Sequence, residues 1–268
     1  MVLNTDVLLQ TAINAAVNAG NAILKIYRQP FNVDLKEDRS PITDADRHAH
    51  EVISHELANT RIPVLSEEGR NCDYSERKFW ELFWLVDPLD GTKEFVNRNG
   101  EFTVNIALIE KNIPVAGIIF IPVKDTLYFA SEKGAFRIDD TSAKNLNLPL
   151  EEMGRFSVHL PEPITSERFR VVASRSHMNS ETEEFIELQR KNHSDIEIVS
   201  AGSSLKFCMI AEGRADIYPR FGPTMEWDTA AGHAIVKYSG GKVLQQGNEI
   251  ELSYNKQDLK NPNFISYR

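Results

Sequence analysis

Cysteine is nearly absent from this chain: only Cys72 and Cys208 occur among its 268 residues. Neither belongs to a CxxC pair and neither has a histidine cluster beside it, so the sequence argues against a disulfide framework or a structural zinc site. We expect no signal peptide ahead of them. The pattern favours reduced thiols in a cytoplasmic protein.

Long hydrophobic runs and an excess of positive charge are absent too. The longest apolar run, Val115 to Val123, falls well short of the roughly 18 residues that a membrane-spanning helix needs. Lysines and arginines number 30 against 39 aspartates and glutamates, which leaves a formal net charge of -9. A chain of this charge repels phosphate polymers, which argues against a nucleic-acid partner. A small anion can still bind where metal ions reverse the charge locally. Peripheral association with a membrane stays open.

The first part of the sequence contains helical patterns followed by β-rich runs. Apolar residues recur at helical spacing from Asp6 to Arg28 and from Asp44 to Ala58, where Thr43 is placed to cap the second helix. Strands are predicted in "IPVLSEEG" and "ELFWLVD", each of which ends in carboxylates. From Phe102 to Arg137, β-rich runs separated by short polar turns predict an antiparallel meander.

The second part alternates between strand and helix. Helices are predicted from about Ser180 to Lys191, from Ser203 to Glu212 and from Thr229 to Tyr238, with strands between them. This alternation is typical of an α/β layer, whereas the first part reads as α+β. We therefore predict two lobes, residues 1–160 and 161–268, with a site where they meet.

Two aspartates stand close together in "WLVDPLDGT". Asp87 and Asp90 follow an apolar strand that is predicted to end at Val86, and that geometry can aim both carboxylates and the Leu89 carbonyl at one point. Such hard oxygen ligands suit Mg²⁺. Gly91 would let the backbone approach a phosphate at the start of a following helix. Read alone, however, the same tetrapeptide is more often a surface turn.

Other carboxylates stand at the ends of predicted elements. Glu67 and Glu68 end the strand in "PVLSEEG", Asp46 lies in "SPITDAD", and Asp228 lies in "EWDTAAGHAI". Each has a plain structural alternative: Asp46 with Thr43 is close to a helix-capping box, and Asp228 is a candidate N-cap for a helix that starts at Thr229. Neither alternative accounts for the whole set.

Together these motifs resemble the inositol monophosphatase superfamily of magnesium-dependent, lithium-sensitive phosphatases, whose signatures look like "DPLDGT" and "WDTAAGHAIVKYSGG". The resemblance covers nearly the full chain. It implies a layered αβαβα sandwich, with an antiparallel N-terminal sheet and a mixed C-terminal sheet. Within the superfamily, "DGTKEF" and "GSSLKFCMIAEGRADIYPRFGPTMEWDTAAGHA" are similar to bacterial 3'(2'),5'-bisphosphate nucleotidases, whereas inositol monophosphatases typically carry "DGTTNF". Lys93 therefore tilts the expected substrate towards a nucleotide.

The resemblance implies a role for each matching acid. It places one Mg²⁺ on Glu67, Asp87 and the Leu89 carbonyl, a second on Asp87, Asp90 and Asp228, and a third, weaker ion on Glu67 and the phosphate. Two metals clamp the attacking and leaving oxygens and activate the water. Asp46, acting through Thr92, is the expected base. Glu68 stays open as an alternative to Glu67, because successive strand residues face opposite ways.

The resemblance also implies a set of substrate contacts. Gly91 and Thr92 would hold the scissile phosphate, and Lys206 and Arg220 would hold the second phosphate with help from Ser203 and His177. Taken singly, Lys206 and Arg220 are more often solvated surface charges. The complete set of implied substrate-binding residues is Glu67, Leu89, Asp90, Gly91, Thr92, Lys93, His177, Ser203, Lys206, Arg220 and Asp228.

The predicted activity is removal of the 3'-phosphate from adenosine 3',5'-bisphosphate, a by-product of sulfate assimilation, or from 3'-phosphoadenylyl sulfate. The nearest alternative is an inositol monophosphatase or another sugar phosphatase. A catalytically silent nucleotide or metal sensor is a third reading, but a retired site tends to lose carboxylates whose repulsion costs stability. Whether the protein is a monomer or a homodimer stays open.

Overall fold

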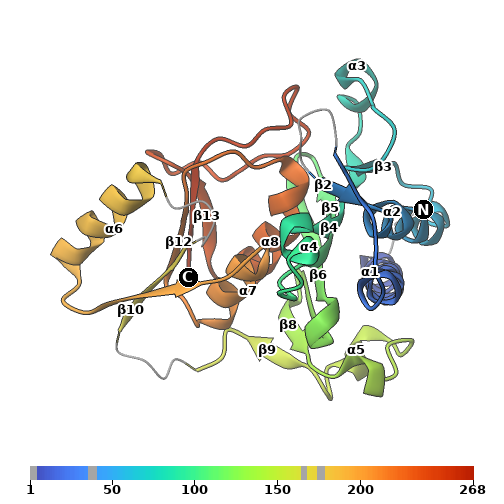
Figure 1. The fold of residues 1–268 in the computed structure, drawn as a ribbon, viewed down its shortest axis with the longest axis horizontal. Coiled ribbons are helices and arrows are strands. Elements are labelled where there is room, and N and C mark those ends of the chain that lie inside the picture. Colours follow the sequence, from blue (N-terminus) through green and yellow to red (C-terminus); the bar gives the residue numbers. More distant parts are fainter. Residues whose placement is uncertain (1–4, 36–40, 164–167, 174–178) are drawn as a thin grey trace.

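The computed structural model describes residues 5–35, 41–163, 168–173 and 179–268. Helices and sheets alternate through the molecule in five layers, αβαβα, as expected from the resemblance (Figure 1). Three hydrophobic cores fill the spaces between the layers. His177 lies outside the described residues.

The larger sheet has seven strands in the order β3-β4-β5-β6-β7-β8-β9. All neighbours are antiparallel except β3 and β4, which run parallel. The predicted meander is therefore confirmed, while β9 was missed because its short run lies in a polar region. The bounds are β3 Val64–Ser66, β4 Leu82–Asp90, β5 Thr103–Glu110, β6 Ile113–Ile121, β7 Thr126–Ser131, β8 Gly134–Ile138 and β9 Val158–Leu160.

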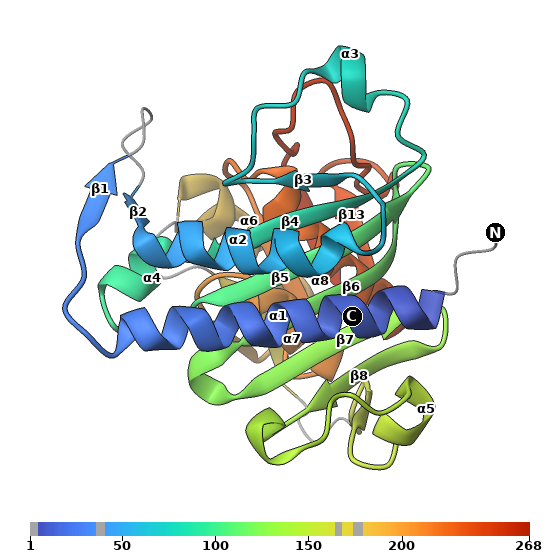
Figure 2. The same ribbon diagram turned by 90° about the vertical axis from the view of Figure 1, so that its right-hand side faces the viewer.

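Two long helices, α1 (Thr5–Tyr27) and α2 (Asp44–Ala58), cover the outer face of this sheet (Figure 2). Both match their predicted ranges to within one residue. Among the described residues only α1 is long and apolar enough, by length and composition, to cross a membrane. More than half of its most apolar window is buried, which is also the property of a core helix.

The smaller sheet has the strand order β11-β10-β12-β14-β13, with α6 (Ser180–Asn192) on its outer face (Figure 1). It is mixed: β10 runs parallel to β11 and β12, and β14 runs antiparallel to β12 and β13. The bounds are β10 Phe169–Ala173, β11 Ile196–Ser200, β12 Ile217–Arg220, β13 Lys242–Gln245 and β14 Phe264–Tyr267.

The middle layer consists of α7 (Leu205–Glu212) and α8 (Glu226–Tyr238), between the two sheets. α8 approaches β6 closely at Gly117, where an added Cβ would lie 2.5 Å from the Ala231 carbonyl oxygen. Helices from the second half of the chain therefore pack on the sheet built by the first half. The division into two lobes stays a prediction.

The remaining elements are short. β1 (Val33–Leu35) pairs antiparallel with β2 (Pro41–Thr43), directly before α2. α3 (Tyr74–Arg77) lies in the connection between β3 and β4, and α4 (Thr92–Val96) follows β4. The others are α5 (Leu150–Met153) and two 3-10 turns at Pro122–Lys124 and Thr141–Ala143.

Candidate active site

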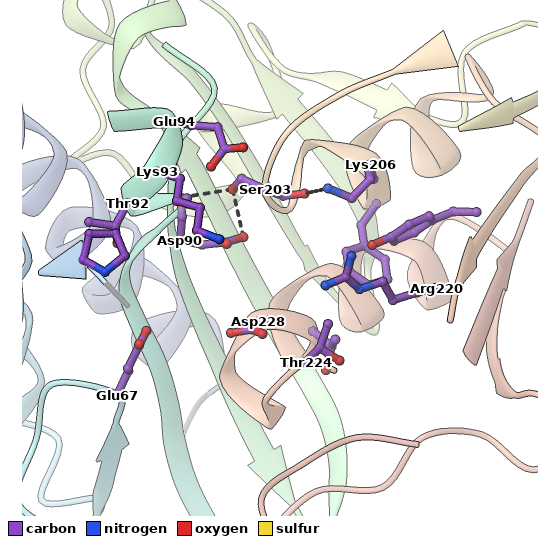
Figure 3. A pocket seen from close by; sticks show the side chains of 15 residues that line it. Glu67, Asp90, Thr92, Lys93, Glu94, Ser203, Lys206, Arg220, Thr224 and Asp228 are labelled. Carbon is purple, nitrogen blue, oxygen red and sulfur yellow. Dashed lines mark hydrogen bonds between the residues drawn. The ribbon is translucent and has the colours of Figure 1, made fainter. Parts of the chain in front are cut away.

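A pocket of about 290 Å³ opens where β4, α4, the loop before α7, β12 and the first turn of α8 come together. Figure 3 shows carboxylates at one end of it and Lys206 and Arg220 at the other. Its lining residues are Pro41, Glu67, Asp90, Gly91, Thr92, Lys93, Glu94, Ser203, Lys206, Phe207, Tyr218, Arg220, Thr224, Asp228 and Thr229.

Asp87 and Asp90 lie at the end of β4, which runs on to Asp90. The prediction that this strand ends at Val86 is wrong. Asp87 pairs with Asn105 of β5, and Asp90 pairs with Thr103. The pairing therefore advances by three residues along β4 but by only two along β5, which shifts the register. An extra residue of this kind is a β-bulge, which redirects side chains at a strand end. The Leu89 amide donates to Asp87 Oδ1 at 3.1 Å, which holds the bend.

Asp90 is held by the loop before α7. Its Oδ2 accepts hydrogen bonds from Ser203 Oγ at 2.8 Å and Ser204 Oγ at 2.6 Å, while Asn105 Nδ2 lies 3.4 Å away. Asn105 also donates to Ser204 Oγ at 2.7 Å. Three polar side chains thus fix the direction of one carboxylate.

Asp46 both caps a helix and contacts Thr92, a residue that lines the pocket. Its Oδ2 accepts from the Thr43 amide at 2.8 Å and the Thr43 hydroxyl at 2.7 Å, so the capping box is confirmed. Its other oxygen accepts from Thr92 Oγ1 at 3.1 Å. Burial raises the pKa of Asp46 above its ordinary value, although the hydrogen bonds from Thr43 and Thr92 oppose this shift. The capping role therefore does not exclude a role in catalysis.

Glu67 and Asp228 approach the same region from opposite sides. Glu67 follows β3 and lines the pocket, whereas Glu68 is not among the lining residues (Figure 3). Asp228 lies in the first turn of α8 and accepts from the Met225 amide at 2.8 Å. The prediction that it is the N-cap of a helix starting at Thr229 is wrong, because α8 begins at Glu226 and Asp228 bonds back to the residue before the helix.

The acids perturb one another strongly. Burial and the negative charges of Glu67, Asp90 and Asp228 raise the pKa of Asp87 well above its ordinary range. Burial and the charge of Asp90 likewise raise the pKa of Asp228 to about 8. A group of carboxylates that is costly to ionise together is suited to a cation that compensates their charge.

The donor chemistry of this end of the pocket fits Mg²⁺, since every candidate ligand is a hard oxygen. Across the described ranges, no three acidic, histidine or cysteine side chains converge into a ready-made metal cage. Asp90 is hydrogen-bonded to Ser203 and Ser204, and Asp228 is hydrogen-bonded to the Met225 amide.

α4 begins at Thr92, as predicted, and Gly91 precedes it. Gly91 has φ 92°, and a Cβ there would lie 3.2 Å from both the Glu101 carbonyl oxygen and Ser203 Cβ. Only glycine adopts this backbone conformation without strain. The turn therefore brings the backbone close to the floor of the pocket.

Lys206 and Arg220 form the cationic end of the pocket. Lys206 is 6% exposed and donates to the Ser203 carbonyl oxygen at 2.6 Å, and its Nζ lies 5.6 Å from the centre of the Tyr218 ring. Burial lowers the pKa of Lys206 to about 8. Arg220 Nη2 donates to the Pro223 carbonyl oxygen at 3.0 Å, while its buried Nε has no hydrogen-bond partner. Lys206 is therefore not a solvated surface charge, whereas Arg220 is half-buried.

Most of the predicted residues line this pocket, but Asp46, Asp87 and Leu89 are buried beside it and are not lining residues. Ser203 and Lys93 both line the pocket, but the Ser203 hydroxyl is already bonded to Asp90. His177 falls outside the described residues. The sequence reading missed Ser204, Asn105, Glu94, Tyr218 and Thr224. A polar Asn105 inside the apolar strand "FTVNIALIE" was the one signal that pointed to this group.

Comparisons with known proteins found similar proteins over nearly the whole chain. A model of the inositol monophosphatase family matches residues 4–265. Proteins named 3'(2'),5'-bisphosphate nucleotidase CysQ are 43% identical in Salmonella typhimurium and 42% in Escherichia coli, each alignment covering 96% of this chain and 98% of the relative. The crystal structure of CysQ from Bacteroides thetaiotaomicron superposes with a TM-score of 0.90 at 49% identity, covering 99% of this chain and 98% of that one. Identity at this level over nearly the whole length, together with the family match, shows that the chain belongs to the inositol monophosphatase family.

Proposed function

We propose that this protein is a metal-dependent 3'(2'),5'-bisphosphate nucleotidase that hydrolyses the 3'-phosphate of adenosine 3',5'-bisphosphate to AMP and phosphate. The similarity to the CysQ proteins supports this activity. The single observation that carries it is one pocket with carboxylates at one end and two cations at the other. A substrate with two phosphates fits such a pocket, because one phosphate meets metal ions and the other meets Lys206 and Arg220.

The acidic end is proposed to hold two or three Mg²⁺ ions. Their ligands would be the carboxylates of Glu67, Asp87, Asp90 and Asp228 and the carbonyl oxygen of Leu89. When bound, the ions lower the pKa of a water molecule and neutralise charge on the attacking and leaving oxygens. Glu67 is preferred to Glu68 because it lines the pocket.

Asp46 and Thr92 are proposed to move the proton. The Thr92 hydroxyl donates to Asp46 Oδ1, so its oxygen lone pairs are directed away from Asp46 and can accept a hydrogen bond from water. Asp46 then takes the Thr92 proton as Thr92 takes the proton of the attacking water. Burial raises the pKa of Asp46, which makes its carboxylate a better base than an exposed aspartate.

Gly91, Thr92 and Lys93 are proposed to hold the scissile phosphate through the turn into α4. Gly91, with φ 92°, lets the chain turn into α4 without strain. Ser203 is proposed to contact the substrate as well as to orient Asp90. His177 stays a proposed contact of the second phosphate. Two free cysteines in the described structure support the proposed cytoplasmic setting.

Hydrolysis of matched substrates tests this function. The wild-type protein with Mg²⁺ is expected to prefer adenosine 3',5'-bisphosphate to 3'-AMP by roughly 10- to 100-fold in kcat/KM, the range for lost hydrogen bonds to a charged group. Arg220→Met should lose this preference while still hydrolysing 3'-AMP. 3'-Phosphoadenylyl sulfate belongs in the same series. A preference for inositol 1-phosphate would contradict the proposal in favour of the sugar-phosphatase alternative.

A further inference from the structure

Glu226 is the first residue of α8 and lies two positions before Asp228. Its side chain is fully buried, with 0% exposure, although a buried carboxylate is costly unless it is paired. It does not line the pocket and is not one of the proposed metal ligands. Its position at the start of the helix nevertheless makes it able to fix the turn that carries Asp228.

The chain segment 254–261 supplies the partners of Glu226. The two carboxylate oxygens of Glu226 accept hydrogen bonds from the Asn255 amide at 2.6 Å, the Lys256 amide at 2.9 Å and the Lys256 ammonium group at 2.6 Å. In return, the Glu226 amide donates to the Leu259 carbonyl oxygen at 2.9 Å. Both ends of this residue are therefore bound to the same segment.

Asn261 completes the contact on the other side of the helix start. Its Nδ2 lies 2.8 Å from the Met225 carbonyl oxygen and 3.0 Å from Thr229 Oγ1. Lys256 Nζ lies 3.3 Å from Asn261 Oδ1, which joins the two groups of contacts. The segment thus contacts Met225 and Glu226 before Asp228 and Thr229 after it.

Arg77 ties this arrangement to the larger sheet. It is 3% exposed and belongs to α3, between the strand that precedes Glu67 and the strand that ends at Asp90. Arg77 Nη1 donates to Asn255 Oδ1 at 2.9 Å, and Asn255 Nδ2 donates back to the Arg77 carbonyl oxygen at 2.8 Å. Figure 2 shows α3 beside the C-terminal segment, drawn in red.

We propose that Arg77, Glu226, Asn255, Lys256 and Asn261 form a positioning clamp that sets Asp228 relative to the acids of the larger sheet and so tunes the affinity of the site for Mg²⁺. This proposal rests on the proposed metal-dependent function. The clamp residues touch neither substrate nor metal; they act by holding the first turn of α8 in place. The clamp includes Glu226 and contacts Met225 and Thr229, and Asp228 in turn accepts a hydrogen bond from the Met225 amide. Direct partners of metal ligands affect metal affinity by about 10- to 100-fold, so the lower end of this range is expected for the clamp.

Binding of Mg²⁺ alone to the full chain, measured by calorimetry, tests the clamp. Lys256→Met removes the cation but keeps the aliphatic stem, and Asn255→Gly removes the link to Arg77 while tolerating the positive φ of 68° at this position. Both variants are expected to raise the Kd for Mg²⁺ about tenfold. Lys256→Arg, which keeps a cation for Glu226, should bind more tightly than Lys256→Met.

The matched control is Lys133→Met. Lys133 Nζ pairs with Asp6 at 2.6 Å, the same distance as in the Lys256–Glu226 pair, but the Lys133 pair lies outside the acidic pocket. The control should keep the wild-type Kd. If the clamp variants melt at lower temperature yet bind Mg²⁺ as the wild type does, the clamp is only structural and the proposal is overturned. If the wild type itself binds no Mg²⁺, the proposed metal-dependent function is contradicted, and the clamp proposal that rests on it is contradicted as well.

Discussion

At the scale of single residues, Asp90 is proposed to bind metal, but its negative charge also repels the neighbouring acids. It is fixed by Ser203 and Ser204 and faces the same group of acids as Asp87. Replacing it by asparagine keeps an oxygen for the two serines but removes one charge from the group. Catalysis and stability are therefore expected to respond in opposite senses.

Asp90→Asn is expected to lower kcat/KM at least about 100-fold, because one metal ligand loses its charge. The same change should raise the metal-free melting temperature by about 2 °C or more, since relief of about 1 kcal/mol of repulsion shifts Tm by that much in a chain of this size. Asp195→Asn, at an exposed ion pair with Arg168, is the control. Wild-type turnover in Asp90→Asn would exclude Asp90 as a metal ligand.

The lowered pKa of Lys206 predicts a pH dependence for the proposed substrate site. Its pKa is lowered by burial to about 8, below the ordinary value of 10.5. The folded protein therefore binds fewer protons than the unfolded chain between these values, and the Lys206 contribution to stability rises with pH across that window. Phosphate binding by Lys206 is expected to weaken as the pH rises across the same window, because it needs the charged ammonium group.

The KM for adenosine 3',5'-bisphosphate is accordingly expected to rise as the pH passes about 8. Steady-state kinetics at pH 7, 8 and 9 measure it. Lys206→Met should show a high KM at all three values. If this variant keeps the pH dependence of the wild-type KM, some other group is responsible for it.

Residues of the site differed in how far the sequence revealed them. Glu67, Asp90 and Asp228 could be found because acids at element ends have a recognisable pattern and a family motif. Asn105 gave only the signal of a polar residue in an apolar strand. Ser204 gave none, because its hydrogen bonds to Asp90 and Asn105 cross about a hundred positions of the chain. Local patterns do not encode such pairing.

At the scale of elements, α8 depends on its close contact with β6. An added Cβ at Gly117 would lie 2.5 Å from the Ala231 carbonyl oxygen and 2.7 Å from Ala234 Cβ, so the helix or the strand would have to move. Gly117→Ala is expected to lower the free energy of unfolding by about 1–3 kcal/mol through overpacking. Urea denaturation measures this loss. Gly222→Ala, where nothing lies within 4 Å of the added Cβ, should leave stability near the wild-type value, and equal stability of the two variants would contradict this packing.

The ends of elements were harder to predict than their existence. α2 could be placed from Thr43 and Asp46, because a capping box marks a helix start in the sequence itself. The start of α8 was misplaced by three residues, since Asp228 looks like an N-cap when the contacts of segment 254–261 are unknown. β14 was missed because "FISY" is short and gains its strand pairing only from β12 and β13.

At the scale of the whole molecule, the αβαβα layering could be predicted once the family motifs were read, but the interlocking of its layers could not. The division near residue 160 stays a prediction, and α7 and α8 from the second half pack beside the first sheet. The proposed metal ligands follow this arrangement: Glu67, Asp87 and Asp90 belong to the larger sheet or its edge, and Asp228 belongs to α8.

Mg²⁺ bound between these parts should stabilise the whole fold. At a free concentration about 100 times its Kd, a ligand that binds only the folded state contributes about 2.7 kcal/mol, which corresponds to a rise in Tm of about 5–10 °C in a chain of this size. Thermal melts in EDTA and in excess Mg²⁺, at matched ionic strength, measure this rise. Asp228→Asn removes the ligand that α8 contributes, so most of the shift should disappear in that variant. A full shift in Asp228→Asn would mean that the ions bind to the larger sheet alone and do not join it to α8.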